Sequence, residues 1–238
     1  MFLNFIHACI FAAIMALLLN LETATTNCSV SIAENGNLLA IKEFDSAAYS
    51  HAEQLHVFIE ETLQMASLQM ADIDAVAVSK GPGSYTGLRI GVSAAKGLCF
   101  ALDIPLIAIP TLESMASQAN DAEVNFVIPV LDARRMEVYS SVFNQDMEEI
   151  RETKAEIIDE NSFQEYAAKG KVLILGNGAQ KCKETLTHPN FSFDTTVVPS
   201  AKEMAMLSYK KFKENNLENV AYFEPYYLKD FILLKKKA

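Results

Sequence analysis

The stretch from Ser79 to Leu102 constrains the fold of this chain more than any other. It reads SKGPGSYTGLRIGVSAAKGLCFAL and follows four apolar residues, 75–78, that predict a buried strand. Gly81, Gly83 and Gly87 allow backbone angles that other residues resist, so a tight loop should join this strand to a helix. Strand, glycine-rich loop and helix in this order favour an α/β fold.

Two interpretations of the glycine loop are open. Ser84 or Thr86 could cap the first turn of the helix, whose N-terminus could then bind phosphate or another anion. A strand-to-helix turn without a ligand is the commoner situation. The glycine spacing matches neither the P-loop nor the dinucleotide-binding fingerprint, so spacing alone does not decide.

The helix after the loop has almost no polar face and is predicted to be buried nearly all round. Gly87, Gly91 and Ala95 recur every four residues and form a smooth ridge. This ridge predicts close packing, either inside the domain or across a subunit boundary. Arg89 and Lys96 share one side, which we interpret first as a solvated or interface edge and second as phosphate contacts.

Composition narrows the class of protein. The 238 residues allow one large domain or two small ones, and a hydrophobic content of 50% supports a substantial core. Twenty basic and 30 acidic residues give a net charge of −10, which argues against a broad nucleic-acid-binding surface. The 4 cysteines are far apart and form no CxxC pair, so a reducing cytoplasm fits better than disulfide or zinc frameworks.

Residues 1–19 carry no charged side chain and resemble a signal h-region or a short membrane span. They lack a positively charged n-region and a clean small-residue cleavage site. We interpret Met15 as the start of the folded chain and residues 1–14 as an upstream extension of the reading frame. A signal peptide is the alternative.

Apolar periodicity and turn residues predict the other elements. The first half should contain strands at 17–21, 28–33, 72–79 and 104–109, and helices at 50–69 and from Pro110 through 119. A hairpin turn at Asn35-Gly36 should lead from the second strand into a third. The second half should contain strands at 126–131, 137–143 and 172–175, a short edge strand within 144–161, and helices at 162–168 and 201–215. This order predicts an α/β fold with a mixed sheet in each half.

Four segments in this order carry a family resemblance: LLLNLETATTNCSVSI, SKGPGSYTGLRIGVSAAKGLCFALDIPLIAIPTLESMA, DARRMEVYSSVF and FEPYYLKD. Over nearly the whole chain from Met15, they resemble the bacterial TsaB family. The resemblance implies the two-lobed fold of the actin, sugar-kinase and chaperone (ASKHA) superfamily. The expected parts are residues 1–14 outside the fold, a first lobe at 15–112 with partner-binding helices, a second lobe at 113–221 and a tail at 222–238.

The resemblance implies a function in tRNA modification. TsaB proteins are non-catalytic partners of TsaD, which transfers a threonylcarbamoyl group to the adenosine 3′ of the anticodon in tRNAs that read codons beginning with A. The ATPase TsaE completes the complex, and TsaC supplies threonylcarbamoyl-adenylate. We expect a cytoplasmic protein that pairs with TsaD or with itself and meets tRNA only indirectly, with ATP and a divalent metal on its partners and no cofactor of its own.

The resemblance also guides the search for site residues. TsaD-type sequences place two histidines four residues apart after the strand matching IPLIAI, and Thr111 and Met115 stand there in this chain. A hydroxyl and a thioether cannot hold a hard divalent ion, so neither a catalytic nor a metal site is expected. Superfamily members usually end their first strand with an aspartate, and this chain has a glutamate there. Candidate nucleotide or phosphate contacts are therefore Glu22, Thr23, Gly81, Gly83 and Ser84.

Family members pair with TsaD through two helices, which correspond here to 51–69 and the helix with the glycine ridge. The expected interface consists of His51, Leu55, Phe58, Ile59, Thr62, Gly87, Arg89, Gly91 and Ala95. A charge at Gly91 should then disrupt the heterodimer and leave the monomer folded. The alternative is that both helices only cover their own sheet. The five-residue spacing of His51 and His56 does not suit a helical metal pair, so we expect a capping or surface histidine and a packing one.

Other functions stay open at this point. A small-molecule ATP phosphotransferase of the same fold is one, although the short second lobe and the weak Asp/Gly pattern count against it. An M22-type peptidase is another, but the chain has neither the two-histidine pair nor an HExxH helix. A secreted or membrane protein would depend entirely on residues 1–14. For Asp132 and Arg134 we favour a salt bridge that locks a strand end over a role in binding a ligand.

Overall fold

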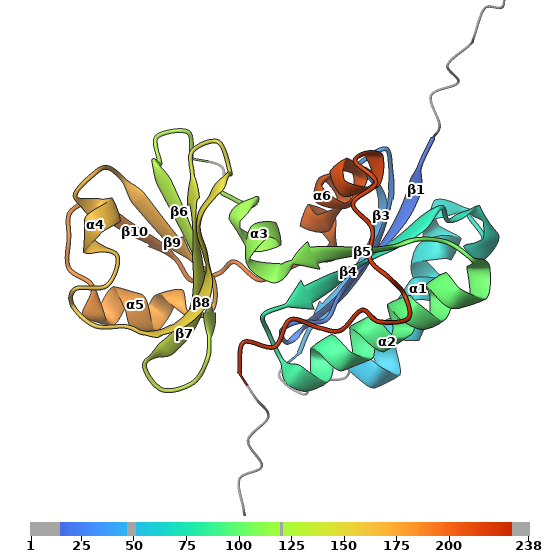
Figure 1. Cartoon of the computed structure of the whole chain (residues 1–238), viewed down its shortest axis with the longest axis horizontal. Coiled ribbons are helices and arrows are strands. Elements are labelled where there is room, and N and C mark those ends of the chain that lie inside the picture. The colour runs from blue at the N-terminus through green and yellow to red at the C-terminus, as the bar shows by residue number, and fades with distance from the viewer. Residues whose placement is uncertain (1–14, 47–50, 120, 230–238) are drawn as a thin grey trace, which may run out of the picture.

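A computed structural model describes residues 15–46, 51–119 and 121–229, and it consists of two lobes, each built on a five-stranded sheet (Figure 1). The α/β fold with a mixed sheet in each half is confirmed. The predictions for residues 1–14 and for the end of the tail, from residue 230 on, lie outside the described residues. Within residues 15–46, 51–119 and 121–229, no helix combines the length and the apolar character needed to span a bilayer.

The first sheet has the strand order β3-β2-β1-β4-β5. Its first three strands form an antiparallel meander, and the other two extend it in parallel. The strands are β1 (Leu17–Glu22), β2 (Asn27–Glu34), β3 (Asn37–Asp45), β4 (Ala75–Gly81) and β5 (Leu106–Pro110). Asn35 and Gly36 adopt φ angles of 52° and 81°, which suit the tight turn of the predicted hairpin.

Helices cover both faces of this sheet, and the alternation of strand residues decides what each face contacts (Figure 1). Leu19 and Leu21 of β1 lie in the cluster formed with α1 (His51–Ala66) and α2 (Tyr85–Leu102). Leu18, the residue before Leu19, lies in the cluster formed with α6 (Ala201–Lys213) on the other face. A single turn of 3-10 helix, η1 (Met70–Asp72), precedes β4.

Helix α6 corrects the expected lobe boundary. It falls within residues 113–221, which the sequence assigned to the second lobe, yet it packs on the first sheet. Ala201 and Met204 are fully buried there, and the Ser31 hydroxyl donates a hydrogen bond to the Ala201 carbonyl at 2.7 Å. The sequence pattern reveals that this helix has an apolar face, but not which sheet that face covers.

The second sheet has the order β10-β9-β6-β7-β8. Counted from β8, it repeats the first sheet, because three antiparallel strands are followed by two parallel ones. Its strands are β6 (Phe126–Asp132), β7 (Glu137–Asn144), β8 (Glu149–Ile157), β9 (Val172–Leu175) and β10 (Phe191–Asp194). Helix α3 (Thr111–Ala116) covers one face, and α4 (Gln164–Ala167) and α5 (Ala179–Thr185) cover the other.

After α6 the chain forms a strap, residues 218–229, that runs along the first lobe and reaches the second (Figure 1). The Glu218 amide donates to the Leu106 carbonyl at 2.8 Å, and the Tyr226 amide donates to the Lys80 carbonyl at 2.7 Å. Near its end, Lys229 forms an ion pair with Glu137 of β7. The strap therefore ties the two lobes together.

Candidate partner interface

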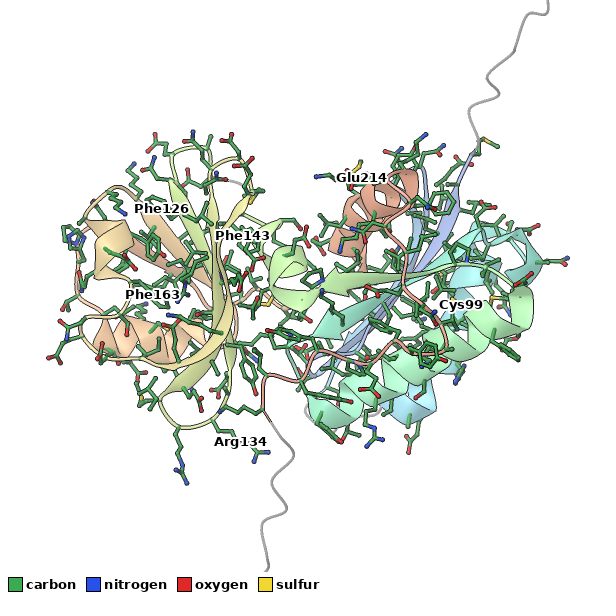
Figure 2. The ribbon with its side chains drawn as sticks, in the orientation of Figure 1. Cys99, Phe126, Arg134, Phe143, Phe163 and Glu214 are labelled. Carbon is green, nitrogen blue, oxygen red and sulfur yellow. The ribbon has the colours of Figure 1, made fainter. Side chains whose placement is uncertain are left out.

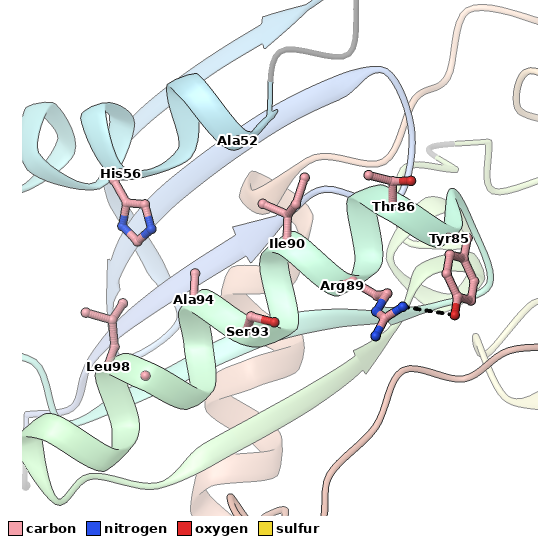
Figure 3. Close-up of a pocket in the computed structure, with 10 residues that line it drawn as sticks. Ala52, His56, Tyr85, Thr86, Arg89, Ile90, Ser93, Ala94 and Leu98 are labelled. Carbon is pink, nitrogen blue, oxygen red and sulfur yellow. Dashed lines mark hydrogen bonds between the residues drawn. The ribbon is translucent and has the colours of Figure 1, made fainter.

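A groove of about 710 Å³ lies on the surface between α1 and α2 (Figure 3). Ile90, Ala94 and Leu98 project from α2 toward α1, and His56 projects from α1 toward α2. Arg89 lies at one end of the groove, where it donates a hydrogen bond to the Tyr85 hydroxyl at 3.1 Å. The groove thus has a mainly apolar floor and a polar rim.

Large apolar side chains extend this surface beyond the groove. Phe100 is 85% exposed and follows Ser93 by seven residues, so both lie on the same side of α2. On α1, Val57 is 50% exposed and Met65 is 59% exposed. An apolar groove with exposed large apolar side chains beside it is typical of a protein-binding surface.

The interface residues expected from the sequence lie mostly on the wrong sides of the two helices. Of that set only Arg89 is exposed, and the rest are buried against the first sheet: His51, Leu55, Phe58, Ile59, Thr62, Gly87, Gly91 and Ala95. These side chains stabilise the lobe and have no surface to offer a partner. The exposed groove is lined by Arg89 and by residues outside that set: Ala52, His56, Tyr85, Thr86, Ile90, Ser93, Ala94, Gly97 and Leu98.

The glycine ridge packs inside the monomer, against the turn between β1 and β2. A Cβ atom on Gly87 would lie 2.1 Å from the Thr23 carbonyl oxygen, and one on Gly91 would lie 2.3 Å from Thr23 Oγ1. The Thr23 hydroxyl donates to the Gly87 carbonyl at 2.8 Å. A charged side chain at Gly91 would therefore strain the monomer itself, contrary to the expectation from sequence.

The two histidines of α1 lie in different environments, and it is His51, not His56, that packs in the lobe. His51 is buried, and its Nε2 lies 2.7 Å from the Thr25 carbonyl oxygen. His56 is exposed at the groove. His51 therefore packs the end of α1 against the β1–β2 turn, and His56 is available to a partner.

The candidate nucleotide residues meet where β1 and β4 end, around Glu22. This carboxyl group is fully buried, and its Oε1 accepts a hydrogen bond from the Ala24 amide at 2.6 Å. Burial raises the pKa of Glu22 to about 7, although hydrogen bonds from Ala24 and Ser79 oppose the shift. No hydrogen-bond partner of Glu22 Oε2 is found among the described residues.

The glycine loop packs against the main chain of the β1–β2 turn. Ser84 caps α2, as one of the sequence alternatives predicted, by accepting a hydrogen bond from the Gly87 amide at 3.3 Å. The Ser84 amide donates to the Ala24 carbonyl at 2.7 Å. A Cβ atom on Gly83 would lie 2.4 Å from that same oxygen. This face of the loop is filled by protein, which favours the interpretation as a packed turn over a phosphate seat.

The positions at which TsaD-type sequences carry histidines are occupied by core residues that do not fit a metal ion. The Thr111 hydroxyl lies 2.8 Å from the Ser79 hydroxyl, and both residues are fully buried. Met115 lies in the apolar cluster beneath α3. Across 15–46, 51–119 and 121–229, no group of three or more His, Cys, Asp or Glu side chains could hold a metal.

Asp132 has the structural role that we favoured, but with a different ionic partner. Its carboxylate accepts a hydrogen bond from the Arg134 amide at 2.6 Å and forms an ion pair with Lys181 at 3.1 Å. Its own amide donates to Asn177 Oδ1 at 2.8 Å. The side chain of Arg134 is exposed on the β6–β7 turn.

Known proteins resemble this chain in sequence and in fold. Residues 45–235 match the family model described as TsaD, tRNA N6-adenosine threonylcarbamoyltransferase. The tRNA threonylcarbamoyladenosine biosynthesis protein TsaB of Escherichia coli is 29% identical over 229 residues, which cover 92% of this chain and 97% of the relative. The TsaB protein of Haemophilus influenzae is also 29% identical and covers 92% of this chain, with 96% of its own length matched.

Solved structures resemble most of the chain as well. A Pseudomonas aeruginosa protein described as similar to the peptidase YeaZ superposes with a TM-score of 0.80 at 26% identity, covering 90% of this chain and 100% of its own. YeaZ from Pseudomonas aeruginosa gives a TM-score of 0.76 over the same shares. These structures share the two-lobed α/β fold with a mixed sheet in each lobe. The chain belongs to the family described by the TsaD model and, within it, to the TsaB proteins.

Proposed function

We propose that this chain is a non-catalytic subunit of tRNA threonylcarbamoyladenosine synthesis that pairs with TsaD through the groove between α1 and α2. The observation that carries this proposal is the apolar surface of that groove with Phe100 beside it, 85% exposed. The names of the TsaB relatives support the assignment to tRNA threonylcarbamoyladenosine synthesis. We also propose that TsaE joins the complex, that a homodimer of this chain competes with TsaD, and that the protein is cytoplasmic.

The groove suits the packing of a partner's helices. Ala52 and Ala94 are small, and a Cβ atom on Gly97 would meet nothing within 4 Å, so a second backbone can come close. Side-chain ridges of a partner helix can then enter the space between α1 and α2. His56 and Arg89 at the rim provide polar groups that can distinguish one partner from another. A second copy of this chain would compete for the same face.

The chemistry of transfer is assigned to the partner. Thr111 and Met115 are core residues, and neither supplies a ligand for a hard divalent ion. Glu22 is enclosed by protein, and the glycine loop beside it is packed against residues 23–25. These features support a subunit that positions TsaD, with ATP and the divalent metal bound by the partners.

Co-elution with the TsaD of the same genome tests the proposal. Phe100→Glu places a charge in the buried interface and should weaken the complex at least about 30-fold, because burial of a phenylalanine contributes about 2 kcal/mol. Circular dichroism should show an unchanged fold. Ile157→Glu is the matched control, since Ile157 is 72% exposed on β8 of the other lobe. Equal binding by wild type and Phe100→Glu would refute the interface.

A further inference from the structure

The arginines of this acidic chain are used in two different ways. Arg151 forms an ion pair with Glu156 at 2.8 Å and is half-buried. Arg89, Arg134 and Arg135 are exposed and form no ion pair with any carboxylate among the described residues. In a chain with 30 acidic residues and a net charge of −10, unpaired surface arginines are unexpected.

These arginines are connected by contacts that begin on the first lobe. Arg89 donates a hydrogen bond to Tyr85, whose ring lies 4.7 Å from that of Tyr227 in the strap. Two residues further along, Lys229 pairs with Glu137 of β7, and its Nζ lies 5.8 Å from the centre of the Tyr139 ring. The strap thus continues the surface from α2 onto the second sheet.

On the second lobe the surface continues through the β6–β7 turn. Lys181 forms an ion pair with Asp132 and donates to the carbonyl oxygens of Arg135 at 2.5 Å and Glu137 at 3.1 Å. Arg134 and Arg135 occupy this turn with φ angles of 73° and 51°. Figure 2 shows Arg134 at the edge of the second lobe, beside the place where the strap ends. We call the whole set the basic strip: Arg89, Arg134, Arg135, Lys181 and Lys229.

The local charge of the basic strip is opposite to that of the chain. Asp132 and Glu137 each pair with one of its lysines, and the strap adds Glu218 and Glu224. These five cations and four carboxylates leave a positive excess, which is carried by the exposed arginines. Guanidinium groups bind phosphate in a bidentate geometry that lysine does not offer.

Exposed tyrosines lie along the strap, which runs from the Tyr85–Tyr227 contact beside Arg89 to Lys229. Tyr222 of the strap is 83% exposed, and Tyr226 and Tyr227 are partly exposed. Bases in single-stranded segments of RNA stack on such rings, and arginine side chains contact the neighbouring phosphates. Arginines interleaved with tyrosines match RNA better than they match an acidic protein, which would need the cations but not the rings.

We propose that the basic strip binds the phosphate backbone of an RNA, with the strap tyrosines beside it as stacking surfaces for unpaired bases. The identity of that RNA as a tRNA rests on the proposed function. Since Tyr85 and Arg89 also line the groove, the strip begins at the proposed TsaD interface and leads from it across both lobes. An RNA on this strip would lie next to the partner. The net negative charge of the whole chain does not reveal this local positive surface.

The test measures tRNA binding by the complex of this chain with TsaD. Arg134→Gln/Arg135→Gln removes two charges far from the groove, and Lys169→Gln/Lys210→Gln removes two exposed charges elsewhere as a control. Fluorescence anisotropy with labelled tRNA between about 50 and 200 mM salt gives the Kd and its salt dependence. For the arginine variant we expect a Kd about tenfold higher and a log–log salt slope smaller by about 1.5. The control should match wild type.

Each outcome separates the two proposals, because co-elution with TsaD is recorded in the same samples. Equal Kd and equal salt slope in both double variants would overturn the basic strip and leave the pairing proposal intact. Loss of TsaD binding with unchanged tRNA affinity would assign the arginines to an acidic protein surface instead. If wild type does not bind TsaD, the pairing proposal fails, and the same titration with the chain alone decides the RNA contact.

Discussion

Glu22→Gln should change the way in which the stability of this protein depends on pH. The Glu22 carboxyl is fully buried at the end of β1, and its pKa is raised from 4.5 to about 7 by burial. Glutamine has nearly the same shape and keeps an oxygen for the Ala24 amide, which donates at 2.6 Å. It cannot ionise, so the variant removes the titration and preserves the packing.

The sign and the size of the effect follow from the two pKa values. Between pH 4.5 and pH 7 the folded protein keeps a proton on Glu22 that the unfolded chain loses, so stability falls as the pH rises. A shift of this size corresponds to about 3 kcal/mol, since each pKa unit contributes about 1.4 kcal/mol. Below pH 4.5 the contribution of neutral Glu22 to the free energy of unfolding is fully present. Above pH 7 this contribution is lost.

Urea unfolding at a series of pH values between about 5 and 8 measures this contribution. The free energy of unfolding of Glu22→Gln relative to wild type should increase by about 2.5 kcal/mol across that range. Glu160→Gln, at an exposed position, serves as the control and should show no such trend. A constant difference between Glu22→Gln and wild type at every pH would refute a neutral, buried Glu22.

Other predictions concern the packing of α2, the strap and the cysteines. Gly91→Val should lower the free energy of unfolding by about 1–3 kcal/mol or more, because its Cβ would lie 2.3 Å from Thr23 Oγ1. Gly97→Ala, with nothing within 4 Å, should raise it by about 0.5–1 kcal/mol, and similar urea midpoints for the two variants would contradict this packing. Lys96 donates to two strap carbonyls at 3.1 and 2.9 Å, so Lys96→Met should speed amide hydrogen exchange in residues 218–226; unchanged exchange would argue against the restraint. Burial raises the pKa of Cys28 and Cys99 to about 11 and that of Cys182 to about 12, so mass spectrometry should find these thiols unmodified by iodoacetamide at about pH 8 until urea is added, and rapid native labelling would contradict their burial.

The local elements were predictable because they depend on short-range chemistry. Asn35-Gly36 forms the expected hairpin turn, and Ser84 caps the helix that follows the glycine loop. By contrast, α5 and β10 were missed. Helix α5 buries only Ala179 and Cys182 and is otherwise polar, and β10 has just four residues, so neither shows a strong apolar period. The edge strand β8 extends over nine residues, longer than the short strand expected.

The predicted interface failed for a three-dimensional reason. Helix α2 is apolar on nearly every side, so its sequence does not distinguish the face against the sheet from the face in the groove. A glycine ridge fits an internal contact and a subunit contact equally well, and only the position of Thr23 decides between them. The exposed Phe100 belongs to the same apolar pattern, so the sequence does not single it out. Likewise, the arginines of the basic strip meet only after both lobes fold.

Reconstituted transfer to tRNA tests the central claim most directly. The assay combines TsaD, TsaE, TsaC, ATP, threonine, bicarbonate and a tRNA that reads codons beginning with A, with or without this chain. We predict threonylcarbamoyladenosine only when the chain is present, much less with Phe100→Glu, and none from the chain without TsaD. Full product without this chain, or product from the chain alone, would contradict its assignment as a non-catalytic subunit.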